Sequence, residues 1–338
     1  MLVTALLLPL AAFCQQAAVP LKPFEAVEAH MGTLFCIKLY AANQQQAQGA
    51  FRAAFDRIAQ LDDTLSDYKP ESELSRLSTD AVGHPEPVSA DLFEVVASAQ
   101  ELARQTAGAF DITLGPVIRL WRAARKTGNV PTSAALDQAR SRCGYHLLKL
   151  NSASRTIELE KPGMALDVGG IAKGYAADEA LAVLQSKGIH SALVAASGDL
   201  TFSDAPPGRP GWKIGLDSFD KASAPFTKIL ILKNAAISTS GDTEQHLDTN
   251  GKRYSHIINP KTDMGLTDPV TVSIVAPRGI VADSVATAVD VLGPEKGMAF
   301  VNGRPDVAAL IVIRTAKAPR VLESERFREL PGAAGTPN

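Results

Sequence analysis

The sequence predicts a single compact α+β unit in which mixed sheets and helices pack around one core. Short apolar segments typical of strands are interspersed with longer segments whose apolar residues recur at helical spacing. No internal repeat or long linker divides the 338 residues into two halves. A content of 46% hydrophobic and 21% charged residues is typical of a globular chain that buries a core.

The first half of the chain predicts one strand and then several helices. Residues 33–40, TLFCIKLY, favour a strand, and Phe51, Phe55 and Ile58 recur after it at helical spacing. A second helix is expected over Asp91–Thr106, with Ser89 near its start and Gly108 past its end. The remaining expectations here are a short helix capped by Ser133 that stops at Gly144, and a strand over 155–160.

The second half predicts an alternation of strands with two helices. A glycine-rich turn opens a helix over Ile171–Lys187, which Gly188 ends, and SALVAAS then favours a strand. A further helix is expected over 282–293. The other predicted strands cover 227–233, 270–277 and 307–315.

The composition and the cysteine contexts exclude several classes of protein. Lys and Arg number 34 against 36 Asp and Glu, so the formal charge of −2 provides no basic field for nucleic acid. Cys36 and Cys143 lack CxxC spacing and a neighbouring His, which favours two buried thiols over a zinc site or a disulfide.

The two ends of the chain are expected to lie outside a main domain at 24–325. The apolar run at 2–13 has the length of a signal-peptide core, so residues 1–20 are predicted to be a signal peptide or a lipoprotein leader with lipid on Cys14. Alternatively, so short a run is a buried strand or helix. The first interpretation predicts an exported protein, periplasmic or associated with the inner membrane. Residues 326–338 are expected to form a flexible tail.

Two glycine-containing clusters interrupt the apolar pattern. In AGAFDITLGPVIRLW, Asp111 lies between apolar residues and needs a partner that offsets its desolvation, although a carboxylate capping a turn before Gly115 explains it equally well. In LDVGGIAKGYAAD, small residues precede a helix that carries Lys173 in its first turns, which suits a phosphate or ribose. The spacing of a P-loop is absent, and a plain strand-to-helix turn is the alternative.

Two further clusters carry acid–base and metal-binding residue types. His256 follows a predicted strand and precedes a proline-bounded turn with Asn259 and Lys261, so it is either a functional or a structural histidine. Asp283 and Thr287 share one face of a predicted helix. Two oxygen ligands on one face suit a hard cation such as Mg²⁺, although this pair is also frequent on solvated faces.

Taken in order, these clusters resemble the ApbE-type family of FAD:protein FMN transferases. The resemblance spans Met31 to Gly293, and seven ordered motifs are far more specific than any one of them. The matching stretches are MGT at 31–33, SDYKPESELSRLS at 66–78, GAFDITLGP, DVGGIAKGYAAD, ISTSGD, SHIINPKT and ADSVATA.

The resemblance implies a reaction and a site for it. FMN would pass from FAD to a Ser or Thr hydroxyl of a partner protein in an exported redox system, with release of AMP. His256 would be the catalytic base, and Mg²⁺ would be bound by Asp283, Thr287 and the backbone carbonyl of Gly170. The implied FAD site comprises Met31, Tyr68, Ala109, Phe110, Asp111, Asp167, Lys173 and a backbone contact at Ile258.

Three positions depart from the family pattern. Asn259 stands where the family has Asp, Asp263 where it has Gly, and Ser197 where it prefers Gly. An amide cannot act as a base or balance the charge of a metal as a carboxylate can. Two other functions therefore stay open, an FAD pyrophosphatase that yields FMN and AMP, and a periplasmic flavin-binding protein without turnover.

Overall fold

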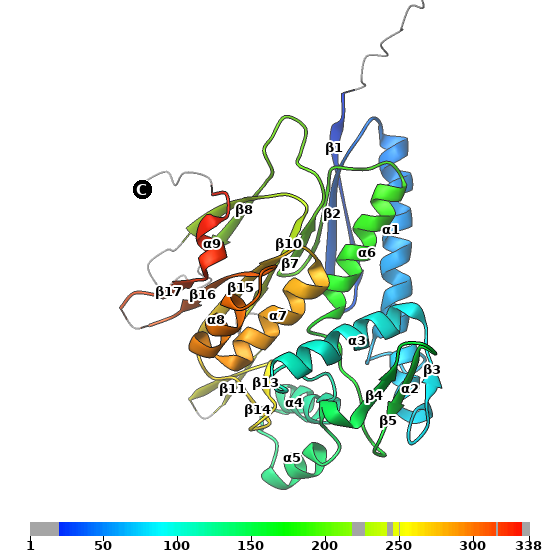
Figure 1. Ribbon diagram of the computed structural model, residues 1–338, viewed down its shortest axis with the longest axis vertical. Coiled ribbons are helices and arrows are strands. Elements are labelled where there is room, and N and C mark those ends of the chain that lie inside the picture. The colour runs from blue at the N-terminus through cyan, green and yellow to red at the C-terminus, as the bar shows by residue number, and fades with distance from the viewer. Residues whose placement is uncertain (1–19, 218–226, 242–245, 250, 316, 333–338) are drawn as a thin grey trace, which may run out of the picture.

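An antiparallel sheet of eight strands forms the frame of the molecule (Figure 1). The computed structural model describes residues 20–217, 227–241, 246–249, 251–315 and 317–332. The chain order of the strands differs from their order in the sheet, which is β1-β2-β6-β7-β10-β15-β16-β17. Their bounds are β1 (Lys22–His30), β2 (Thr33–Ala41), β6 (Ala192–Ala196), β7 (Asp199–Phe202), β10 (Ala235–Ser240), β15 (Val270–Ala276), β16 (Ala308–Ile313) and β17 (Arg320–Glu323).

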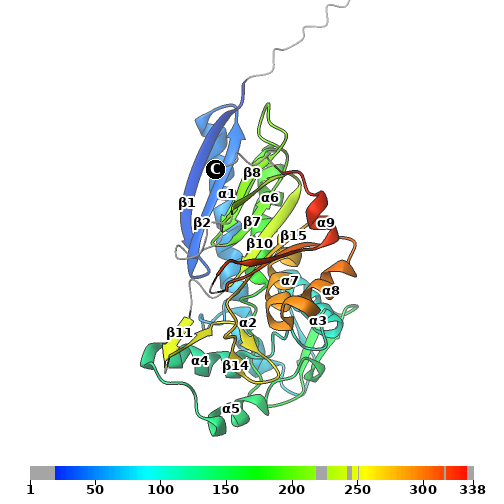
Figure 2. The ribbon, with the colours of Figure 1, turned by 90° about the vertical axis from the view of Figure 1, so that its left-hand side faces the viewer.

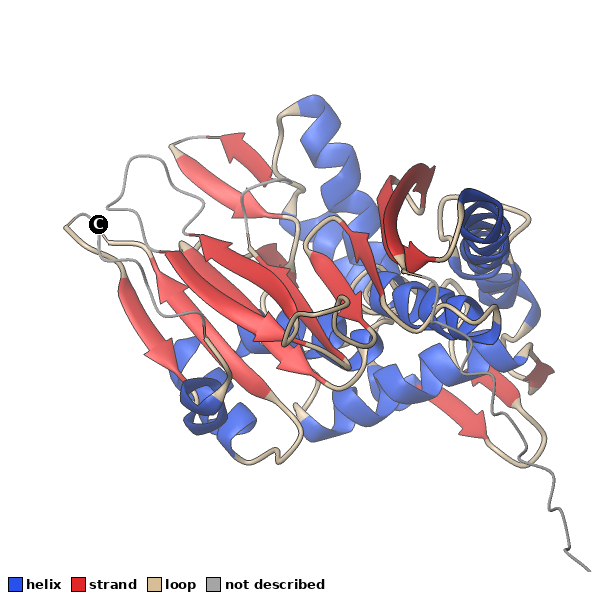
Figure 3. Cartoon of the chain, turned by 90° about the horizontal axis from the view of Figure 1, so that it is seen from above, coloured by secondary structure: helices blue, strands red, loops and turns tan. Residues whose placement is uncertain are grey.

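Three long helices cover one face of this sheet, as the view from above shows (Figure 3). They are α1 (Gln44–Leu65), α6 (Ala172–Ser186) and α7 (Gly279–Leu292). Phe55 and Ile58 of α1 are buried against the sheet, which confirms the helix predicted from their spacing. Helix α6 buries Ala, Gly, Tyr and Leu residues on several sides, because it lies between α1 and α7.

A hairpin and a short helix pack on the opposite face of the sheet. The hairpin is β8 (Trp212–Asp217) with β9 (Thr227–Leu232), and α9 (Glu325–Glu329) lies beside it. Phe327 of α9 is fully buried in this second apolar cluster, and Ile231 N donates a 2.8 Å hydrogen bond to Pro331 O. Phe327 and the bond to Pro331 therefore tie this segment to the sheet, although most of the residues around them are exposed. The flexible tail predicted over 326–338 stays a prediction.

Helices α2 to α5 gather at one end of the sheet, beside two short hairpins and a three-stranded sheet (Figure 2). Helix α3 is capped as predicted, because Ser89 Oγ accepts a hydrogen bond from Leu92 N. Helix α5 is capped by Thr132 rather than Ser133 and ends at Arg140, well before Gly144. The elements here are α2 (Glu73–Asp80), α3 (Ala90–Gln105), α4 (Gly115–Thr127), α5 (Ser133–Arg140), η1 (Tyr145–Leu147), β3 (Glu86–Pro87), β4 (Leu148–Asn151), β5 (Thr156–Leu159), β11 (His246–Thr249), β12 (Lys252–Ser255), β13 (Ile258–Asn259) and β14 (Met264–Gly265).

The structure describes the two predicted buried cysteines but almost none of the predicted leader. Cys36 and Cys143 are half-buried rather than buried, and neither forms a disulfide with another described residue. Cys36 Sγ donates to Glu25 Oε1 at 3.2 Å. The leader predicted over 1–20, with Cys14, lies outside the described residues except for Pro20. None of the helices within the described ranges has the length and apolar character needed to cross a membrane.

Candidate active site

A glycine in the first turn of α6 lets two helices approach unusually closely. A β-carbon on Gly174 would lie 2.1 Å from Gly279 O and 2.8 Å from Asp283 Cβ, so only glycine allows this contact. The Asp178 carboxylate of α6 accepts hydrogen bonds from Gly279 N at 2.6 Å and Ile280 N at 3.1 Å. Helix α6 therefore caps α7 and fixes how the two helices face each other.

This approach brings the predicted metal ligands together. Gly174 N donates a 3.0 Å hydrogen bond to Asp283 Oδ2, and a β-carbon on Gly170 would lie 3.0 Å from Thr287 Oγ1. Thr287 is one turn after Asp283 on α7, with its Oγ1 3.4 Å from Asp283 O. The described residues contain no cluster of three or more His, Cys, Asp and Glu side chains suited to a metal. One carboxylate, one hydroxyl and nearby backbone oxygens make up this oxygen-rich corner.

Lys173 points into the same corner between two carboxylates. Its Nζ lies 3.1 Å from Asp199 Oδ2 and 3.5 Å from Asp283 Oδ2, and donates a 3.0 Å hydrogen bond to Gly169 O. Both carboxylates are buried, whereas the Lys173 side chain is 25% exposed. Part of the Lys173 side chain therefore reaches the surface, although its charge is paired with the two carboxylates.

Asp199 was not among the predicted site residues. It begins β7, and Ser238 Oγ of the neighbouring β10 donates to its Oδ1. A lone carboxylate after Ser197 and Gly198, at the end of an apolar strand, is the sequence feature that could have indicated it.

Burial and charge shift the pKa values of this corner. Desolvation, with the nearby charge of Asp199, raises the pKa of Asp283 to about 7, although Lys173 opposes the shift. Burial lowers the pKa of Lys173, but Asp199 and Asp283 outweigh that effect and hold it above its usual value. The lysine is thus charged at neutral pH and suited to an anionic group such as a phosphate.

The segment before α4 brings only part of its predicted set to this corner. Phe110 is buried, and its Cε2 would lie 3.4 Å from a β-carbon on Gly170. Asp111 turns into the fold, where its Oδ1 accepts from Thr113 N at 2.8 Å and its Oδ2 from Tyr145 N at 3.0 Å. Desolvation raises the pKa of Asp111, and these bonds offset the cost of burial. Ala109 is buried beside Phe110.

Tyr68 and Asp167 are joined by a residue that the sequence did not indicate. Arg122 of α4 donates from Nη1 to Asp67 Oδ2 and from Nη2 to Asp167 Oδ2, the latter at 2.6 Å. Its guanidinium carbon lies 4.1 Å from the centroid of the Tyr68 ring. Arg122 could not be found from local pattern, because its partners lie far away in the sequence.

Two other predicted FAD contacts, Met31 and Ile258, pack against the apolar clusters of the fold. Met31 has a φ of 48° in the tight connection between β1 and β2, and its side chain packs against the main core. Ile258 is buried in β13, where it pairs with Gly265 and packs in a cluster that includes Val117 and Trp121. Both residues therefore serve the packing of the fold, through contacts separate from the ion pairs of the lysine corner.

His256 is exposed at the bend between β12 and β13. The nearby departures from the family pattern have structural roles. Asn259 Oδ1 accepts a 2.9 Å hydrogen bond from Lys261 N, which closes its own turn. Asp263 is buried with a φ of 57°, where glycine is normally favoured, and its Oδ2 accepts from Arg140 Nε at 2.5 Å.

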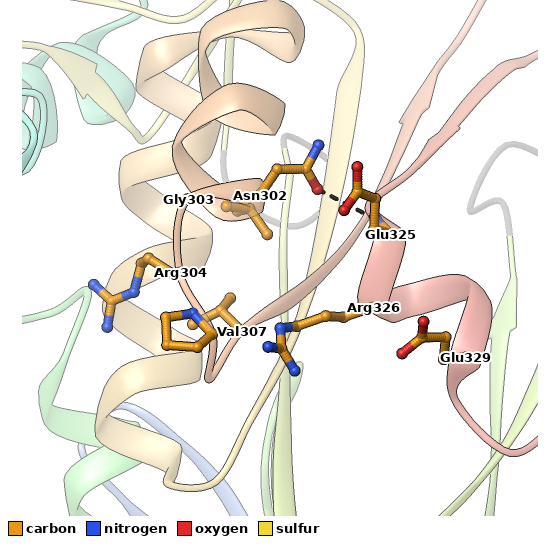
Figure 4. Close-up of a pocket in the computed structure, with 9 residues that line it drawn as sticks. Asn302, Gly303, Arg304, Val307, Glu325, Arg326 and Glu329 are labelled. Atoms are coloured by element: carbon orange, nitrogen blue, oxygen red, sulfur yellow. Dashed lines mark hydrogen bonds between the residues drawn. The ribbon is translucent and has the colours of Figure 1, made fainter.

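A cavity of about 320 Å³ lies elsewhere, between α9 and the loop that follows α8 (Pro294–Asn302) (Figure 4). Arg326, Glu325 and Asn302 are among its lining residues, and Glu325 N donates to Asn302 Oδ1 at 3.2 Å. None of the predicted site residues lines it. Two arginines and two glutamates around it leave no net charge that would select an ionic ligand.

Comparison with known proteins finds similarity over most of the chain. The profile of the ApbE family matches residues 31–311. An FAD:protein FMN transferase from Treponema pallidum is 31% identical over 306 residues, which cover 86% of this chain and 84% of that protein. The flavin transferase ApbE from Vibrio cholerae superposes with a TM-score of 0.83 at 28% identity, covering 92% of this chain and all of that one.

A second solved structure gives the same result. The apo form of the Pseudomonas stutzeri flavinyl transferase ApbE has a TM-score of 0.82 at 28% identity, with 94% of this chain and 99% of that chain covered. These structures share the mixed α+β architecture predicted for this chain. From the profile match and the Treponema relative together, the chain belongs to the ApbE family.

Proposed function

We propose that this chain is an FAD:protein FMN transferase that moves FMN from FAD to a Ser or Thr hydroxyl of a partner protein. The hydroxyl oxygen forms a bond to the phosphorus of the FMN half, the bond from that phosphorus to the bridging oxygen breaks, and AMP leaves with that oxygen. The names of the curated relatives support this reaction. The observation that carries it is the close approach of α6 and α7 at Gly174, which gathers Lys173, Asp283 and Thr287.

The residues of this corner have separate roles in the proposal. Lys173, held between Asp199 and Asp283, is the cation that would bind a pyrophosphate oxygen of FAD. Asp283, Thr287 and the Gly170 carbonyl would hold Mg²⁺, because carboxylate, hydroxyl and carbonyl oxygens are ligands of hard cations. When bound, the ion neutralises charge that develops on the pyrophosphate as AMP leaves.

His256 is the base in this proposal. An alcohol is a weak nucleophile at neutral pH, so a positioned imidazole that takes its proton contributes about 100-fold or more. The acceptor hydroxyl belongs to another protein and must reach the base from outside. The exposure of His256 at the bend after β12 suits that requirement.

The proposed acceptor belongs to an exported redox system in the periplasm or at its membrane. The apolar run at residues 2–13 supports export through a signal peptide or a lipoprotein leader. Expression of the full chain, followed by cell fractionation and mass analysis of its N-terminus, tests this proposal. An uncleaved, unlipidated chain in the cytoplasm would contradict it.

The reaction is tested by incubating the protein with FAD, Mg²⁺ and an acceptor protein, and then measuring AMP and protein-bound flavin. The transferase yields both in equal amounts. Free FMN with AMP would identify a pyrophosphatase, and FAD binding without AMP would identify a binding protein. Omission of Mg²⁺ with excess chelator tests the metal dependence separately.

A further inference from the structure

We infer that Arg122 is a positioning residue for flavin binding, which fixes the ring of Tyr68 so that its outer face can stack on a flat ring of FAD. This inference rests on the proposed function. It concerns a residue outside the set implied by the family resemblance, and the contacts of Arg122 and the exposure of Tyr68 support it.

Arg122 is itself rigidly held. Its two terminal nitrogens donate to two different carboxylates, Asp67 and Asp167, whose side chains are 10% and 7% exposed. A planar guanidinium bonded at both ends cannot rotate without breaking a charged hydrogen bond. The plane of the guanidinium is therefore set by the fold before any ligand arrives.

Tyr68 is placed on this fixed group. The Arg122 guanidinium carbon lies 4.1 Å from the ring centroid, within the range of a cation–π contact. Tyr68 is nevertheless 73% exposed, more than the other exposed large hydrophobic residues Leu21, Val27 and Leu34. Since Arg122 covers one face of the ring, the exposure belongs to the other face and the edge.

An aromatic ring fixed on one side and open on the other is a stacking platform. FAD carries two flat ring systems, isoalloxazine and adenine, and aromatic groups favour offset stacking. The same arginine joins Tyr68 to Asp167, whose Oδ1 accepts from Gly169 N at 2.9 Å at the turn leading to Lys173. The platform is thereby linked to the corner proposed to hold the pyrophosphate.

A purely structural role for Arg122 makes different predictions. If Arg122 only neutralised Asp67 and Asp167, its removal would change the free energy of unfolding. Any effect of that removal on FAD affinity would then be the same with and without the Tyr68 ring. A positioning role requires that the two residues act together on affinity. A double-mutant cycle distinguishes these roles.

The experiment measures the Kd for FAD of wild type, Arg122→Ala, Tyr68→Leu and the double variant, by titration of the full protein. Tyr68→Leu is expected to raise Kd about tenfold, and Arg122→Ala about fivefold. The double variant should be within about twofold of Tyr68→Leu, because Arg122 has no ring left to hold. In turnover, Arg122→Ala should raise KM for FAD and leave kcat nearly unchanged.

Three further arms make the result specific. Arg122→Lys keeps a cation over the ring but cannot bond both carboxylates with a planar fork, so its Kd should be intermediate. If Arg122→Ala does not fold, Arg122→Lys is measured instead, alone and together with Tyr68→Leu, which gives the same double-mutant cycle. Lys126→Ala removes a positive charge from an exposed position of α4 and should not change Kd. Titrations with FMN and with AMP identify which ring occupies Tyr68, because only that ligand should respond to Arg122→Ala.

The outcomes separate the inference from the proposed function. Wild-type protein that binds no FAD overturns both. Wild-type protein that binds FAD, with an affinity unchanged in Arg122→Ala, overturns the inference alone. The inference is also overturned if Arg122→Ala lowers the affinity for FAD equally in wild-type and in Tyr68→Leu protein. Arg122 would then act on affinity without the ring.

Discussion

The Gly174 amide donates a 3.0 Å hydrogen bond to Asp283 Oδ2, and this bond joins the two helices that carry the proposed pyrophosphate and metal residues. The bond exists only because α6 and α7 meet at a glycine, with no room for a β-carbon. The contact between these two helices therefore sets the distances on which the proposed chemistry depends.

Gly174→Ala should destabilise the protein by at least about 2 kcal/mol, because overpacking forces the backbone to shift. The new β-carbon would lie 2.1 Å from Gly279 O, which is backbone and cannot move aside cheaply. Denaturant unfolding measures the change. Gly49→Ala is the matched control, since Gly49 is exposed in α1 with nothing within 4 Å of a β-carbon. That variant should gain about 0.5–1 kcal/mol, and similar values for both variants would contradict the account.

Asp283→Asn should lower Mg²⁺-dependent AMP release at least about 100-fold. The amide oxygen can still accept the bond from Gly174, so the fold should persist while the charge that anchors the metal is lost. AMP release measured against Mg²⁺ concentration tests this. Asp137→Asn, an exposed position of α5, is the control and should retain the wild-type rate. A wild-type Mg²⁺ response in Asp283→Asn would rule out Asp283 as a ligand.

His256→Ala should lose about 100-fold in transfer and keep its affinity for FAD. The base acts on the acceptor hydroxyl and not on the bound flavin, so binding and turnover should separate. FAD titration and single-turnover transfer are measured on the same preparation. His84→Ala, exposed and distant in sequence, is the control. A loss of affinity as large as the loss of rate would make His256 a binding residue.

The stability of the helical layer should depend on pH through Asp91. A hydrogen bond and charge from Arg57, with a hydrogen bond from Tyr175, hold the pKa of Asp91 below its usual value, against desolvation. A folded pKa below the unfolded value of about 3.9 gives stability that is present above that value and is lost as the pH falls through the folded pKa.

Asp91→Asn should therefore be less stable than wild type at pH 7, with a difference that shrinks toward pH 3. The free energy of unfolding measured at both pH values tests this, since the bond from Arg57 Nη2 to Asp91 Oδ1 is 2.5 Å and ionic. A deficit that stays constant across this range would show that the charge of Asp91 does not contribute.

The sequence predicted elements and motifs well where the determinants are local. The apolar spacing of Phe55 and Ile58 and the cap at Ser89 depend only on neighbours along the chain, and the structure confirms both. The burial of Phe327 could not be predicted locally, because the residues that cover it belong to strands far from it in the sequence. The cap of α5 lies one residue before the predicted Ser133, at Thr132, whose hydroxyl accepts a hydrogen bond from Ala135 N.

The candidate site shows the same division. Lys173 and Asp283 were indicated by separate motifs, and tertiary packing brings them within 3.5 Å of each other. Arg122 was missed because its contacts are long-range, whereas Asp199 was missed although a lone carboxylate follows an apolar strand there. Asp111 was assigned to FAD through the resemblance, whereas both of its oxygens accept hydrogen bonds from the protein itself.

The most direct test of the central claim is the ratio of AMP released to flavin attached to protein. The chain is incubated with FAD, Mg²⁺ and an acceptor protein that the Vibrio cholerae flavin transferase modifies, with that enzyme as the positive control. The proposed reaction predicts one AMP for each FMN bound to the acceptor, and neither product from Asp283→Asn above background. AMP accompanied by free FMN, or FAD binding without AMP while the control enzyme is active, would contradict it.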